Sequence, residues 1–230
     1  MRARYSEPKK RSPLKSLALL LTIILAVGLV GLALIGAADL PPVLPSLGKG
    51  STNENLIGII SGHWQSDSGA VCPDGLEEAD LNMGIARSVA RILRQSGYAV
   101  EVLPEYAAKL NGYEAACLVS IHCDSCIYGV SGYKVARMTH SSVPELEDRL
   151  VNCISDEYHR ATGLEPHLNS ITEDMLEYHA LRRIAPTTPG AIIECGFMGE
   201  DRYLLTQEQD RVALGIANGI LVFLGEGEAE

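Results

Sequence analysis

Residues 56–62 read LIGIISG, and residues 78–95 read EADLNMGIARSVARILRQ. The first stretch is a short apolar run that ends in glycine, which is typical of a strand buried on both faces. In the second stretch the apolar side chains recur every three or four positions and form one helical stripe. The residues of that stripe are Leu81, Ile85, Val89, Ile92 and Leu93. A buried strand followed by an amphipathic helix predicts the beginning of an α/β domain.

The same alternation continues towards the C-terminus. Further strands are expected at residues 98–103 (YAVEVL), 115–121 (AACLVSI), 132–138 (GYKVARM) and 191–193 (AII). Helices are expected at residues 144–161, with Ser142 as the N-cap, and at residues 207–224. Strands that alternate with helices predict a twisted, largely parallel sheet with helices on both faces. We assign this α/β domain to residues 55–225.

An uncharged segment precedes the domain. Residues 17–38, LALLLTIILAVGLVGLALIGAA, are long enough as a helix to cross a hydrocarbon core of about 30 Å. Six of the first 15 residues are basic and one is acidic. By the positive-inside tendency we expect a cytoplasmic segment at 1–16, a transmembrane anchor at 17–38 and an exported domain at the cell membrane.

A cleaved signal peptide is the alternative for this segment, because Gly36, Ala37 and Ala38 are small residues of the kind a signal peptidase accepts. The apolar run is longer than the usual signal core of about 7–15 residues, which favours an uncleaved anchor. Residues 39–54 are rich in Pro, Gly and Ser and predict an extended stalk, and residues 226–230 form an acidic tail.

Charge excludes one class of partner. The chain has a formal net charge of −10, and from Asp39 onward it carries 13 basic and 28 acidic residues. A protein that binds nucleic acid needs clustered Lys and Arg on one face. We therefore expect no nucleic-acid partner.

Six cysteines allow up to three disulfides in an exported chain, with 15 complete pairings that the sequence leaves open. Cys123 and Cys126 form a C-x-x-C motif, but no second such pair exists to complete a four-thiolate zinc site. Small core residues or one structural bridge is a better interpretation than a redox centre, because the motif follows a strand rather than opening a helix.

Polar residues stand where this architecture places sites, at the carboxyl ends of parallel strands. His63 follows the first strand, His122 follows the third and Glu194 ends the last, while Glu78 opens the first helix on the side of its apolar stripe. Two imidazoles and a carboxylate bind Zn²⁺ well, and a catalytic zinc keeps its fourth position for water. Glu194 would then be free to act on that water.

Five ordered motifs resemble the zinc-dependent N-acetylmuramoyl-L-alanine amidases of the Amidase_3 type, which are bacterial cell-wall hydrolases. The motifs are Gly62–His63, Ser68–Gly69–Ala70, Glu78–Ala79–Asp80–Leu81–Asn82, Ser120–Ile121–His122–Cys123–Asp124 and Ile193–Glu194–Cys195–Gly196–Phe197–Met198. The resemblance covers roughly residues 55–225.

The resemblance implies that His63, Glu78 and His122 bind one Zn²⁺ and that Glu194 is the catalytic carboxylate. It also implies that the substrate is peptidoglycan, cleaved at the amide between N-acetylmuramic acid and L-alanine of the stem peptide. The chain differs from the family pattern at two places. Trp64–Gln65 replaces the usual glycine pair after the first histidine, and Leu103–Pro104–Glu105 stands where a Thr-Arg…Asp segment is expected.

Three further residues are candidates around this centre. Asn82 lies one helical turn after Glu78, and Asp124 lies two residues after His122 on the same strand face, where it orients a ligand or caps a turn. His179, ahead of the last strand, either approaches the substrate or is an ordinary surface histidine.

Two other classes of function remain open from the residues. One is a non-catalytic peptidoglycan-binding or regulatory module, whose usual sign is loss of a ligand or of the catalytic carboxylate, and neither is lost here. The other is a different zinc hydrolase such as a peptidase. The sequence contains no H-E-x-x-H, G-x-S-x-G or G-x-x-x-x-G-K-[ST] motif, which argues against zincin, serine-hydrolase and P-loop interpretations.

Overall fold

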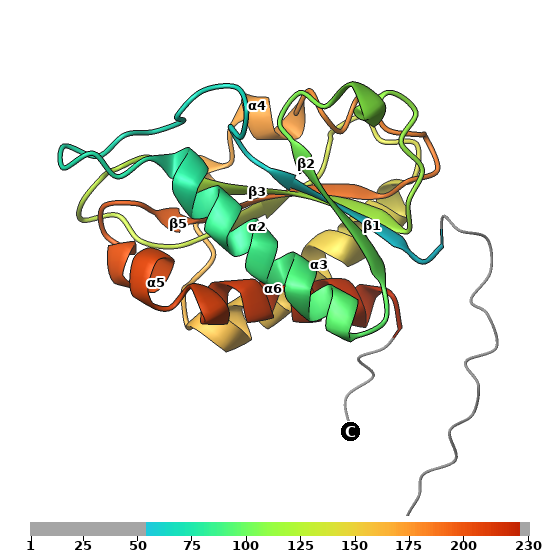
Figure 1. The fold of residues 1–230 in the computed structure, drawn as a ribbon. Coiled ribbons are helices and arrows are strands. Elements are labelled where there is room, and N and C mark those ends of the chain that lie inside the picture. Colours follow the sequence, from blue (N-terminus) through green and yellow to red (C-terminus); the bar gives the residue numbers. More distant parts are fainter. Residues whose placement is uncertain (1–53, 226–230) are drawn as a thin grey trace, which may run out of the picture. The chain divides into compact units, whose positions relative to one another are not determined.

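Five strands form one sheet in the part of the chain that the computed structural model describes, residues 54–225 (Figure 1). They are β1 (Leu56–Ser61), β2 (Ala99–Pro104), β3 (Cys117–Asp124), β4 (Lys134–Ala136) and β5 (Gly190–Phe197). Their order across the sheet is β2-β1-β3-β5-β4. The first three neighbouring pairs are parallel, and β4 is antiparallel to β5. The prediction of a largely parallel sheet is confirmed, with one antiparallel strand at its edge.

Three long helices cover one face of this sheet: α2 (Glu78–Gln95), α3 (Pro144–Thr162) and α6 (Gln209–Phe223) (Figure 1). Over residues 54–225 the opposite face is covered by short elements and loops, among them η1 (Ala108–Leu110) and α4 (Glu173–Leu176). The remaining elements are η2 (Leu168–Ser170) and α5 (Arg202–Gln207). We expected helices on both faces. The long helices lie on one face, and the second face has only short ones.

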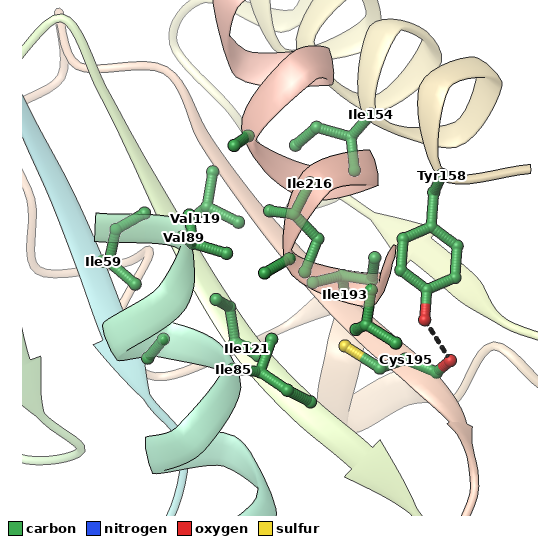
Figure 2. Close-up of a cluster of buried hydrophobic side chains, with 14 of the residues drawn as sticks. Ile59, Ile85, Val89, Val119, Ile121, Ile154, Tyr158, Ile193, Cys195 and Ile216 are labelled. Atoms are coloured by element: carbon green, nitrogen blue, oxygen red, sulfur yellow. Dashed lines mark hydrogen bonds between the residues drawn. The ribbon is translucent and has the colours of Figure 1, made fainter. Parts of the chain in front are cut away.

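The larger core lies between the sheet and the three long helices (Figure 2). Ile85 and Val89 of the predicted α2 stripe pack with strand side chains such as Val119 and Ile193, and Ile216 of α6 closes the layer. Tyr158 of α3 is fully buried in this core and donates its hydroxyl proton to the Cys195 carbonyl oxygen. Because this apolar layer is continuous, it holds the carboxyl ends of β1, β3 and β5 in fixed positions beside one another.

Several predicted boundaries differ from the structure. The strand expected at 132–138 is confined to β4, and the helix expected at 207–224 starts at Gln209, because Glu208 has a non-helical backbone that separates α5 from α6. Ser142 does not cap α3: the N-cap position is Val143, whose N–H donates to the Ser141 hydroxyl. The helix at 78–95 is confirmed at both ends.

Among residues 54–225, no helix is long and apolar enough to cross a bilayer. The predicted cytoplasmic segment at 1–16, the transmembrane anchor at 17–38, residues 39–53 of the stalk and the acidic tail lie outside the described residues.

Candidate metal centre

Three side chains from three different elements meet at the carboxyl edge of the sheet. His63 follows β1, His122 lies in β3 and Glu78 is the first residue of α2. Glu78 Oε1 lies 3.2 Å from His63 Nε2 and 3.1 Å from His122 Nδ1. One donor atom from each residue lies within 4.8 Å of the other two. The structure thus brings together the three residues that the sequence analysis proposed as ligands.

This donor set fits a zinc ion. Zinc bonds of about 2.0–2.1 Å at tetrahedral angles separate neighbouring ligand atoms by about 3.3 Å. The separations of 3.2 Å and 3.1 Å from Glu78 Oε1 to the two imidazole nitrogens are close to this value. Two imidazole nitrogens and one carboxylate oxygen also leave the fourth position of such an ion for water.

Hydrogen bonds within this cluster shift the pKa values of its members. Burial would raise the pKa of Glu78, but hydrogen bonds with His122 and His63 outweigh burial and hold that pKa well below its usual range. Burial would lower the pKa of His122, but hydrogen bonds with Glu105 and Glu78 raise it to about 10. A proton and a metal ion compete for the same imidazole nitrogen, so these contacts mark the place where a cation would bind.

Glycines and amides hold the ligands in place. A Cβ atom on Gly62 would lie 2.4 Å from His122 Cε1, so only glycine leaves room for this imidazole. Asn82, one of the predicted candidates, donates from Nδ2 to Glu78 Oε1 and to the Gly62 carbonyl oxygen, each at 3.2 Å. The Ala70 N–H donates to Glu78 Oε2 at 3.0 Å. Glu78 is therefore fixed by its neighbours on both oxygens.

Glu194 lies beside the three ligands. It is the register partner of His122 in the parallel ladder between β3 and β5, so both side chains project from the same face of the sheet. Its Oε2 atom is buried and has no hydrogen-bond partner within the described residues. Burial, together with the nearby charges of Glu78 and Asp124, raises the pKa of Glu194 to about 7. A carboxylate with a pKa near neutrality suits proton transfer.

The other two candidates have different surroundings. Asp124 Oδ2 lies 2.5 Å from Lys134 Nζ, and Asp124 Oδ1 accepts from the Ser125 N–H. His179 is half-buried, and its Nε2 lies 2.6 Å from Glu105 Oε1. Neither residue contributes to the cluster of His63, Glu78 and His122.

Sequence reasoning missed three residues next to the centre: Glu105, Tyr178 and Asp67, whose Oδ1 lies 2.5 Å from His63 Nδ1. Glu105 follows the last residue of β2, which is the same strand-end rule that selected His63, His122 and Glu194. Tyr178 carried no such signal, since it lies in an irregular segment before β5.

One disulfide joins two loops at this edge of the sheet, between Cys72 and Cys126. The other four cysteines are free. The preference for a structural bridge over a C-x-x-C redox centre is confirmed, because Cys126 pairs with Cys72 and not with Cys123.

Comparison with known proteins places this chain in a family. The family model Amidase_3, described as N-acetylmuramoyl-L-alanine amidase, matches residues 57–222. A comparison with curated proteins finds no match.

Solved structures have the same fold. The catalytic domain of CwlV, an N-acetylmuramoyl-L-alanine amidase from Bacillus (Paenibacillus) polymyxa var. colistinus, is 25% identical, with a TM-score of 0.57 over 75% of this chain and 99% of that chain. An N-acetylmuramoyl-L-alanine amidase from Clostridium difficile 630 is 22% identical, with a TM-score of 0.61 over 76% of this chain and 98% of that chain. The CwlD amidase from Clostridioides difficile, solved in complex with the GerS lipoprotein, is 20% identical, with a TM-score of 0.59 over 75% and 100%. Since the family model spans most of the chain, this protein belongs to the Amidase_3 family of N-acetylmuramoyl-L-alanine amidases.

Proposed function

We propose that His63, Glu78 and His122 hold one Zn²⁺ and that Glu194 is the general base and acid with which this amidase hydrolyses peptidoglycan. The amidase activity, cleavage of the amide between N-acetylmuramic acid and L-alanine of the stem peptide, follows from family membership. The observation that carries the residue roles is the convergence of three donor atoms within 4.8 Å beside a carboxylate with an unpartnered oxygen.

Each residue has a separate task in this scheme. A bound Zn²⁺ supplies a Lewis acid that polarises the scissile carbonyl and lowers the pKa of water at the site. Glu194 accepts the proton of the attacking water at its free oxygen and then delivers it to the nitrogen of the leaving L-alanine amine. Asn82 keeps the Glu78 carboxylate oriented through the hydrogen bond to Oε1. The products are the lactyl carboxylate of the sugar and a stem peptide with a free amino terminus.

Product analysis tests the scheme. The purified protein is incubated with muropeptides, and the products are identified by mass spectrometry before chelation, after chelation and after zinc is restored. We expect new amino groups on L-alanine, loss of cleavage on chelation and recovery with zinc. Cleavage inside the stem peptide would indicate a peptidase, and capture of peptidoglycan without products would indicate a binding module.

We also propose that residues 17–38 anchor the enzyme in the cell membrane with the catalytic domain outside the cytoplasm. The support is the uncharged run of 22 residues preceded by a basic segment. Sequencing the N-terminus of the protein recovered from the membrane fraction separates an uncleaved anchor from a cleaved signal peptide.

A further inference from the structure

We propose that Glu105 is a positioning residue that orients both histidines of the metal centre, an inference that rests on the ligand set proposed above. The Glu105 side chain is only 6% exposed, although the residue follows the end of a strand and belongs to no helix. Four hydrogen-bond donors face its two oxygens, and two of them belong to the histidine ligands.

The Oε2 atom of Glu105 faces the ligands directly. It accepts from the backbone N–H of His63 at 2.9 Å and lies 3.6 Å from His122 Nε2. The Oε1 atom lies 2.6 Å from Tyr178 Oη and 2.6 Å from His179 Nε2. A carboxylate that faces donors on both oxygens is held in one orientation, and in turn it holds the groups that donate to it.

The first of these groups is the imidazole of His122. Its Nδ1 atom faces Glu78 Oε1, so Nδ1 is the nitrogen available to the metal. Its Nε2 atom lies 3.2 Å from Tyr178 Oη. In the neutral ring that binds a metal through Nδ1, the proton is on Nε2. The Nε2–H group then donates a hydrogen bond to the Tyr178 hydroxyl, which in turn donates a hydrogen bond to Glu105. This chain of hydrogen bonds fixes both the tautomer and the rotation of the ring.

The second group is the backbone of His63. His63 has a φ of +64°, a left-handed conformation that residues other than glycine adopt at a cost in energy. The parallel pairing of Ser61 with Pro104 places the end of β2 beside the end of β1, and Glu105 there accepts the His63 N–H. This contact fixes the loop from which the His63 side chain reaches Glu78 Oε1.

In Glu105→Gln the amide oxygen must face the His63 N–H, which can only donate, and this turns the NH₂ group towards Tyr178 and His179. The Tyr178 hydroxyl must then accept from the amide, so the chain of hydrogen bonds that runs from His122 through Tyr178 to Glu105 is broken at that point. Tyr178→Phe is the milder variant, because it keeps the ring and removes only the hydroxyl between His122 and Glu105. Glu101→Gln is the matched control: Glu101 lies in β2, the strand that Glu105 follows, and also accepts from a tyrosine, Tyr113 Oη at 2.9 Å, but its partners lie outside the metal centre.

The experiment measures the dissociation constant for Zn²⁺ by competition with a chromophoric chelator in the full-length protein and in the three variants. The urea midpoint of the zinc-free form is measured in parallel. We expect zinc binding to weaken by about 10–100-fold in Glu105→Gln and to a smaller degree in Tyr178→Phe, with no change in Glu101→Gln. A purely structural role for Glu105 would lower the urea midpoint and leave the zinc affinity of the folded protein unchanged.

The outcomes separate this inference from the proposed function. If the wild-type protein binds no zinc, the ligand set is wrong and the role of Glu105 falls with it. If the wild type binds zinc and both Glu105→Gln and Tyr178→Phe bind it equally well, the ligand set stands and the role of Glu105 is overturned. If Glu105→Gln does not fold, Tyr178→Phe decides: weaker zinc binding supports the chain of hydrogen bonds, and wild-type binding refutes it.

Discussion

Lys134 is the register partner of Glu194 in the antiparallel ladder between β4 and β5, and its ammonium group forms an ion pair with Asp124 and donates to the Ser170 carbonyl oxygen. The Nζ atom lies 2.5 Å from Asp124 Oδ2, and both side chains are largely removed from solvent. The pair is thus a buried ion pair next to the proposed catalytic carboxylate. The carboxylate of Asp124, one of the predicted candidates, therefore faces Lys134 and is not part of the cluster of His63, Glu78 and His122.

Loss of Lys134 alone should be costly. Lys134→Met leaves the Asp124 carboxylate buried without its partner, and we expect a loss of about 3–5 kcal/mol in the free energy of unfolding. The double variant Lys134→Met with Asp124→Leu should recover most of this loss, because an apolar pair of similar volume needs no compensation. Urea unfolding measures both effects.

An exposed ion pair provides the control for this cycle. Arg91 and Asp210 lie 3.2 Å apart on the surface, and Arg91→Met should change the free energy of unfolding by less than about 1 kcal/mol. If Lys134→Met has an effect as small as Arg91→Met, the buried pair does not stabilise the sheet edge.

Glu194→Gln should separate catalysis from metal binding. The amide keeps the size of the side chain but cannot accept the proton of water, so we expect kcat to fall by about 10²–10⁴-fold. Zinc binding should stay within a few-fold of wild type, because Glu194 is not among the three converging donors. Release of stem peptide with a free L-alanine amine measures the rate, and Glu165→Gln, an exposed carboxylate, is the control. A wild-type rate in Glu194→Gln would contradict the assignment.

Gly62→Ala should displace the imidazole of His122, a proposed zinc ligand, without removing any ligand side chain. The added Cβ would lie 2.4 Å from Cε1 and 2.5 Å from Nε2 of His122, so the imidazole must move away from Glu78 and Tyr178. We expect weaker zinc binding together with a loss of stability of about 1–3 kcal/mol. Chelator competition and urea unfolding measure the two effects.

Gly58→Ala is the matched control for this variant. Gly58 is also in β1, and its Cβ would lie 2.8 Å from Tyr113 Cε1, away from the metal centre. It should destabilise the protein and leave its zinc affinity unchanged. Equal zinc affinities for the two alanine variants would show that Gly62 makes no special room for His122.

The parts of this structure that follow local patterns were predictable. The apolar run at β1 and the helical stripe of α2 each bury one continuous surface, and their positions were predicted closely. That His63 and His122 come together was predictable, because His63 follows β1, His122 lies near the carboxyl end of β3, and the carboxyl ends of parallel strands share one edge. The direction of β4 was not, since an isolated three-residue strand has the same alternation in either direction.

The role of Glu105 depends on the order of the strands. The arrangement β2-β1-β3 brings Glu105, which follows β2, beside His63 and places its Oε2 atom 3.6 Å from His122 Nε2. Strand order is set by the packing of the whole core, so the residues around Pro104 do not predict which strands lie beside β2. The pairing of Cys72 with Cys126 has the same origin, because six cysteines allow 15 pairings and the fold selects among them.

Opening the disulfide should destabilise the domain. Cys72 and Cys126 are 54 residues apart, and closing a loop of this length stabilises the folded state by about 4 kcal/mol in the chain-entropy description. We expect the double variant Cys72→Ser with Cys126→Ser to unfold at a lower urea concentration than wild type and to be insensitive to reductant. Cys153→Ser, at a free and half-buried cysteine, is the control. A wild-type midpoint in the double variant would show that the bond does not stabilise the fold.

The pH dependence of stability should contain a contribution from Glu147. This residue of α3 is buried: its Oε1 accepts from the Gly190 N–H at 3.1 Å, and its Oε2 has no hydrogen-bond partner in the described part of the chain. Burial raises the pKa of Glu147 above the ordinary 4.5. The native state therefore binds more protons than the unfolded state in the window above pH 4.5, and this contribution to stability is lost as the pH rises.

Glu147→Gln removes this titration and keeps an acceptor for Gly190. The variant should therefore gain stability relative to wild type between pH 4.5 and pH 7, and the two should converge below pH 4, where the wild-type carboxyl is protonated. The metal ligands titrate in both proteins and cancel in the difference between the two urea unfolding curves at each pH. Glu145→Gln, which replaces an exposed carboxylate on the same helix, is the control variant. A constant difference between Glu147→Gln and wild type across this range would mean that the Glu147 carboxyl has the same pKa in the folded and unfolded chains.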